Sequence, residues 1–71
     1  MRYAIVIEQE KAGYTAHVPD LPGCVATAET REEVVEHIHK AIEERIAFLR
    51  DEGWTVPEPR TVTDYAEVQF A

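Results

Sequence analysis

Three histidines and a single cysteine are the side chains of this sequence best suited to bind a metal ion or to act as a base or nucleophile. His37 and His39 are two positions apart on a predicted helix, about 200° around its axis, so they cannot share a metal ion. His17 falls within a predicted strand, where an interface or surface role is favoured over catalysis. Cys24 follows a Pro-Gly turn with no cationic neighbour in the sequence to activate its thiol, which favours a small, half-buried structural role. These four residues predict no catalytic centre, no metal site and no cofactor.

The glycines and the charge balance argue against phosphate-bearing ligands. Gly13, Gly23 and Gly53 are separated turn and cap residues, and none belongs to a phosphate-binding loop. Fourteen acidic residues against seven basic ones give a net charge of −7. Direct binding of nucleic acid is not expected, because neutralising phosphates requires clustered Lys and Arg. The acidity fits either solubility or a basic protein partner.

The length of 71 residues predicts one domain, spanning residues 1–71, with a small core. A chain this short buries only about 60% of its unfolded surface, which gives marginal stability. The hydrophobic content of 45% is normal for a folded protein, so some apolar surface is expected to be buried by self-association or by a partner. One cysteine, no recognisable signal peptide and no apolar run long enough for a membrane favour a cytoplasmic protein.

Alternating apolar residues and turn residues predict three strands, at residues 2–9, 14–18 and about 24–28. Thr30 and Glu33 have the spacing of a capping box, which predicts a helix from there to about Glu52. One side of this helix carries an apolar stripe, formed by Val34, Val35, Ile38, Ala41, Ile42, Ile46 and Leu49, with Phe48 at its flank. Arg45 projects near the centre of the stripe, which predicts either a packed stem with a solvated head or an ion pair.

A fourth strand is predicted at about residues 65–70, where Ala66, Val68 and Phe70 alternate with polar positions. The element order β-β-β-α-β predicts an α+β fold with a four-stranded mixed sheet of order 3-2-1-4. The first strand would be central, and one long helix would cover one face. The opposite apolar face would stay open and favour a homo-dimer or a higher homo-oligomer.

Several motifs resemble the HicB family of antitoxin domains in order and spacing. They are an aromatic strand residue (Tyr14), the loop Pro19-Asp20-Leu21-Pro22-Gly23-Cys24, the helix start Glu29-Thr30-x-Glu32-Glu33 and the connector Val56-Pro57-Glu58-Pro59. Ala28 stands where the family usually has glycine. The sequence ends at Ala71, where many family members continue into a DNA-binding region, so the resemblance implies a stand-alone form without that region.

The resemblance implies a partial RNase-H-like fold and the neutralisation of HicA-type toxins, which are small basic RNases. It also prompts a search for a nuclease-like carboxylate site, for which the candidates are Glu8, Asp20, Glu29, Asp64 and Glu67. Such a site needs several acids on the central strand, and the first strand offers only Glu8, so solvated surface acids are favoured.

The leading hypothesis is therefore a non-enzymatic, antitoxin-like binding module that masks a basic toxin, with His17, Arg45 and Trp54 as candidate interface residues. A self-associating structural or sensor domain of the same fold, without a toxin partner, is the alternative. A residual nuclease is the least favoured hypothesis.

Overall fold

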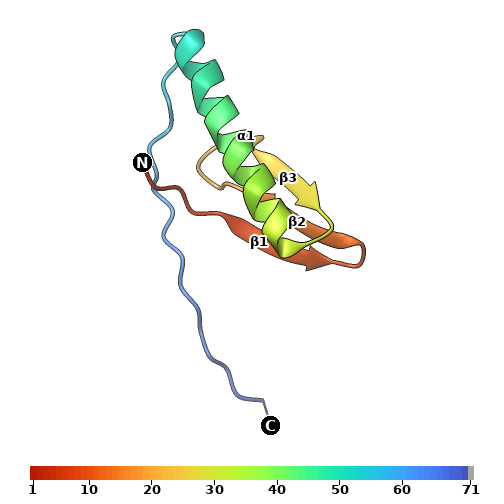
Figure 1. Cartoon of the computed structure of the whole chain (residues 1–71). Coiled ribbons are helices and arrows are strands. Elements are labelled where there is room, and N and C mark those ends of the chain that lie inside the picture. Colours follow the sequence, from red (N-terminus) through yellow and green to blue (C-terminus); the bar gives the residue numbers. More distant parts are fainter. Residues whose placement is uncertain (71) are drawn as a thin grey trace.

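The computed structural model describes residues 1–70 as three strands followed by one long helix (Figure 1). The strands are β1 (Val6–Glu10), β2 (Gly13–His17) and β3 (Val25–Ala28), and the helix is α1 (Arg31–Asp51). The strands form one antiparallel sheet in the order β1-β2-β3, and α1 packs across one face of it. The α+β character predicted from the sequence is therefore observed.

The hairpin between β1 and β2 sets the register of the sheet. Its two-residue turn places Glu10 opposite Gly13 and Ile7 opposite Ala16, and β3 continues the pairing with Ala26 opposite Ala16. Gly13 has φ +151°, and a Cβ added there would overlap the carbonyl oxygen of Ala28. The turn therefore needs glycine for the close approach of β3 as well as for its backbone conformation.

The helix begins where the Thr30–Glu33 spacing predicts. Thr30 is the N-cap, and its Oγ1 accepts a hydrogen bond from the backbone N–H of Glu33 at 3.2 Å and donates one to the Glu33 carboxylate at 2.9 Å. At the other end, the N–H of Trp54 bonds the carbonyl of Leu49 at 2.8 Å, and Gly53 adopts φ +71°. This left-handed glycine ends the helix.

The core lies between β2, the loop after it and the first half of α1. Six residues are buried there: Ala16, Val18, Leu21, Cys24, Val34 and Ile38. The second half of α1 extends beyond the sheet (Figure 1), so Ile42, Ile46 and Leu49 are only half-buried. The fold therefore leaves part of the apolar stripe of α1 accessible.

The predicted four-stranded mixed sheet of order 3-2-1-4 is wrong. The sheet has three strands and is entirely antiparallel, β1 lies at its edge, and β2 is central. Residues 54–70 contain no strand or helix, and the segment predicted as a fourth strand runs away from the sheet (Figure 1). An alternating pattern shows that a segment can pair as a strand, but it does not determine which edge, or which chain, the segment pairs with.

The expectation of an apolar open sheet face also needs correction. Ile7, Ala16 and Ala26 pack toward α1, so their neighbours along each strand point to the opposite face. That face carries Val6, Glu8, Thr15, His17, Val25 and Thr27. It is mixed rather than apolar, because the apolar residues of β1 are divided between both faces while β2 and β3 contribute mainly polar ones.

Candidate functional site: an interaction surface beside the Val18–Cys24 loop

The loop between β2 and β3 is a hydrogen-bonded unit. The N–H of Val18 bonds the carbonyl of Cys24 at 3.1 Å, and the N–H groups of Leu21 and Cys24 bond the carbonyls of Val18 and Leu21 at 3.0 Å each. Leu21 is 1% exposed and fills the core, while Pro19 and Pro22 face solvent. Gly23 has φ +83°, which a side chain would strain. The Pro-Asp-Leu-Pro-Gly-Cys motif thus encodes the shape of this loop.

Asp20 joins the loop to the segment that follows α1, residues 54–61, which we call the connector. Its carboxylate accepts hydrogen bonds from the N–H groups of Arg60 and Thr61, each at 2.8 Å, and from the Thr61 hydroxyl at 2.9 Å. The bond from the Thr61 N–H is the largest cause that holds the pKa of Asp20 below its ordinary value, followed by the bond from the Arg60 N–H. Asp20 is therefore an anchor for the connector, and it fixes the point from which residues 62–70 leave the fold.

A hydroxyl group on the N-terminal segment holds the same connector. The Tyr3 hydroxyl donates a hydrogen bond to the carbonyl of Pro57. Burial is the largest cause that raises the pKa of Tyr3, and the nearby carboxylate of Asp20 adds to the effect. The phenol therefore stays protonated and keeps donating this bond at neutral pH.

Exposed side chains from the second half of α1 and the turn after it border the loop, and we call Arg45, Phe48 and Trp54 the aromatic patch. The rings of Phe48 and Trp54 meet edge to face, with centroids 5.6 Å apart and planes at 82°. They are 45% and 58% exposed, and Val25 is 65% exposed. Phe48, Arg45 and Val25 line a shallow hollow with Gly23. Exposed Trp, Phe and Arg together are typical of protein-binding surfaces.

The structure brings two of the three candidate interface residues to this patch. Arg45 lies in it, with Nη2 donating to the carbonyl of Pro22 at 3.2 Å and the side chain exposed. Trp54 packs on Phe48 at the far end of the patch. His17 is on the open sheet face, paired in register with Val25. The sequence placed Phe48 only at the flank of an apolar stripe, so its exposure and its contact with Trp54 were not foreseen.

The other motif residues have structural positions. Tyr14 is half-buried opposite Ala28 in the sheet. Cys24 is buried, and burial is the largest cause that raises the pKa of its thiol, with Arg45 opposing the shift. The thiol is therefore neutral and unreactive at ordinary pH.

The histidines on α1 point in different directions, as their spacing predicts. His37 Nδ1 lies 3.1 Å from the carbonyl of Thr27, and His39 lines a groove beside the N-terminal segment. Within residues 1–70, no group of three or more His, Cys, Asp or Glu side chains is arranged to hold a metal ion. Over the same residues, α1 lacks the long apolar stretch that a bilayer-crossing helix needs.

The fold is that of a small α+β protein with an exposed aromatic patch beside the Val18–Cys24 loop. The sequence model of the family described as "HicB_like antitoxin of bacterial toxin-antitoxin system" matches residues 3–70. The chain belongs to this family of antitoxins, as its motifs suggested. Membership of an antitoxin family suggests a non-enzymatic role.

Individual relatives agree with this assignment. A UPF0150 protein of Archaeoglobus fulgidus is 46% identical over 44 residues, which are 61% of this chain and 64% of that protein. Antitoxin HicB 1 of Photorhabdus laumondii is 33% identical over 73 residues, covering 100% of this chain and 47% of the relative. The chain therefore spans about two thirds of the first relative and about half of the second. Among solved structures, the HicA3 and HicB3 toxin-antitoxin complex matches with a TM-score of 0.71 at 27% identity, covering 83% of this chain and 70% of the matched chain.

Proposed function

We propose that this chain acts as an antitoxin that neutralises a small basic HicA-type RNase toxin by covering its surface. The observation that carries the proposal is the similarity to a chain of the solved HicA3 and HicB3 toxin-antitoxin complex. The net charge of −7 supports it, because an acidic protein attracts a basic partner. Residues 1–71 would act as a single HicB-like unit in this role, without enzymatic activity of their own.

The aromatic patch is the surface we assign to the toxin. Its two rings give a large apolar contact area at the outer side of α1, and Arg45 is held in place by the carbonyl of Pro22. Exposed acids accompany the patch, with Glu44 lining the same hollow and Asp51 and Glu52 at the end of the helix. Apolar contacts at the centre with acids around them suit a basic partner, since the acids speed the encounter and the rings slow dissociation.

The effect of the acids on association and the effect of the rings on dissociation can be measured separately. The association and dissociation rates are determined at increasing salt concentrations, with a purified HicA-type toxin as the partner. At low salt the association rate is expected to exceed the range of about 10⁵–10⁶ M⁻¹s⁻¹ typical without electrostatic steering, and to fall as salt is added. The dissociation rate should change much less. An association rate that is independent of salt would contradict the electrostatic part of the proposal.

A pair of aromatic substitutions tests the assigned surface. Trp54→Ala removes the exposed ring that packs on Phe48, and we expect the dissociation constant for the toxin to rise at least about tenfold, as at interface hot spots. Tyr65→Ala is the matched control, because Tyr65 is an aromatic residue that is 95% exposed and lies outside the patch. Equal losses of affinity, or no loss in either variant, would contradict the assignment. Circular dichroism of both variants checks that the fold is retained.

The non-enzymatic part of the proposal has its own test. The purified chain should not cleave RNA in the presence of magnesium, because within residues 1–70 the acids of the edge strand β1, Glu8 and Glu10, belong to no group of side chains that could hold a metal ion. RNA cleavage that copurifies with the chain and is lost in Glu8→Gln would overturn this part.

A further inference from the structure

Residues 62–70, which we call the tail, are an extended segment whose apolar side chains contact almost nothing. Val62 is 89% exposed, Tyr65 95%, Val68 68% and Phe70 93%. The tail also lengthens the molecule, whose radius of gyration is 14.3 Å, whereas a compact chain of this length has about 11 Å. Two aromatic rings of about 150–250 Å² each are normally buried in a protein interior or an interface. The tail therefore lacks its partner surface in the isolated chain.

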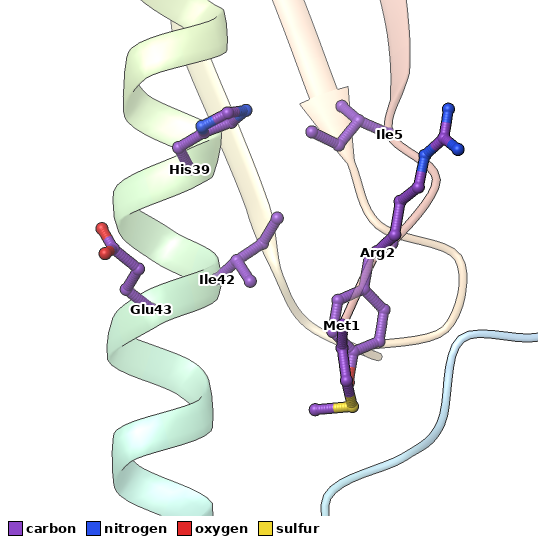
Figure 2. Close-up of a pocket in the computed structure, with 7 residues that line it drawn as sticks. Met1, Arg2, Ile5, His39, Ile42 and Glu43 are labelled. Atoms are coloured by element: carbon purple, nitrogen blue, oxygen red, sulfur yellow. The ribbon is translucent and has the colours of Figure 1, made fainter.

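A groove lined in part by apolar side chains lies between α1 and the N-terminal segment, residues 1–5. Figure 2 shows Ile5 and Ile42 projecting from opposite sides toward the space between them. The groove continues along α1, where Tyr3, Ile46 and Ala47 line it, and it ends at Arg50. The distance from His39 to Arg50 along the helix is about 17 Å, which an extended segment of about five residues spans.

The charges of the tail and the groove are complementary. The tail contains Asp64 and Glu67 and no basic residue. The groove is bordered by Arg2 at the N-terminal segment and by Arg50 at the end of α1, with Glu43 as its acidic member. A tail lying in the groove would thus bring its two carboxylates near the guanidinium groups of Arg2 and Arg50. Its apolar side chains would contact the isoleucines that line the groove.

The tail does not reach the groove of its own chain. The Asp20 carboxylate holds Arg60 and Thr61, and the chain then passes Arg2–Ala4 before it leaves the fold in the direction away from α1 (Figure 1). To enter its own groove the tail would have to turn back across the N-terminal segment. The tail can enter the groove of a second molecule without turning back in this way.

We propose that two copies of this chain exchange their tails, so that Ala66–Phe70 of each copy lies in the groove formed by Met1–Ile5 and the His39–Arg50 part of α1 of the other. The exposed backbone edge of β1 lies beside this groove and offers hydrogen-bond partners to an extended segment of a second chain. Each chain keeps its own three-stranded sheet, and the contact lies between the chains. The groove and the aromatic patch are on opposite flanks of α1, so the exchange leaves the patch free.

Sedimentation equilibrium at tens of micromolar measures the assembly. The unmodified chain, of 8.1 kDa, is expected to sediment at twice that mass. Val68→Asp places a charge on the apolar face of the tail and should yield the 8.1 kDa monomer. Gln69→Asp is the matched control, because it introduces the same charge one residue away on the opposite face, and it should remain dimeric.

A second pair of variants tests the groove rather than the tail. Ala47 lines the groove and is exposed, so Ala47→Glu should retain the fold and abolish the dimer. Thr27→Glu adds the same charge on the open sheet face and should leave the dimer intact. A monomeric unmodified chain, or a dimer that survives either Val68→Asp or Ala47→Glu, would overturn the proposal. These outcomes are independent of toxin binding, which is measured at the aromatic patch.

Discussion

Replacing Leu21 by alanine tests how much the loop after β2 contributes to stability. Leu21 is 1% exposed and packs in the core with Val34 and Ile38, which are both 0% exposed. The substitution removes about three methylene equivalents, worth about 2.4 kcal/mol at about 0.8 kcal/mol each, and it leaves a cavity that adds to the loss. We expect the free energy of unfolding to fall by about 3–4 kcal/mol, within the range measured for buried Leu→Ala changes.

This loss is large for a small protein. A chain of this size has a total free energy of unfolding of about 4–11 kcal/mol, so Leu21→Ala should remove at least about a third of it. Urea unfolding followed by far-ultraviolet circular dichroism and by Trp54 fluorescence measures the change. Val25→Ala, at a position that is 65% exposed in the adjoining strand, should change the free energy by less than about 0.5 kcal/mol. If Leu21→Ala cost no more than Val25→Ala, the loop would not be part of the core.

Three further predictions follow from the loop and the helix start. Thr30→Ala removes the N-cap hydrogen bond and should lower the free energy of unfolding by about 1 kcal/mol, whereas Lys40→Ala should be nearly neutral; equal urea midpoints for the two variants would place the cap elsewhere. Because the folded pKa of Asp20 is depressed, the charged form stabilises the fold near neutral pH, and this contribution is lost as the pH falls through the depressed pKa. Asp20→Asn should therefore be less stable than the unmodified chain near neutrality and converge with it in acid, whereas a gap that widens in acid would refute this sign. Iodoacetamide should alkylate Cys24 far more slowly in the folded chain than in urea, because burial raises the thiol pKa, and equal rates would show that the thiol is accessible.

The local features of the fold could be predicted from the sequence because each depends on neighbouring residues. The Thr30–Glu33 spacing located the start of α1, and Gly53 located its end. The loop motif predicted a turn at Pro22-Gly23, where Gly23 indeed has positive φ. Such signals act within a few residues, so they do not depend on the rest of the fold.

The features that depend on distant parts of the chain could not be predicted in the same way. The alternation of Val68 and Phe70 indicated a strand, but the contacts of Asp20 with Arg60 and Thr61 direct that segment away from the sheet. The apolar residues of the predicted first strand, residues 2–9, suggested a central strand, although Tyr3 and Ile5 in fact pack against the core ahead of the paired region, which begins at Val6. The aromatic patch was missed in part because helix periodicity alone does not show that Phe48 is exposed and packs on Trp54.

The most direct test of the antitoxin role is a titration of RNA cleavage by a purified HicA-type toxin from the same genome. The folded chain is added in increasing amounts, and Trp54→Ala and Tyr65→Ala are titrated in parallel. We expect the unmodified chain and Tyr65→Ala to abolish cleavage near one chain per toxin, and Trp54→Ala to require a clear excess. A toxin that remains fully active with an excess of the folded, unmodified chain would contradict the proposed function.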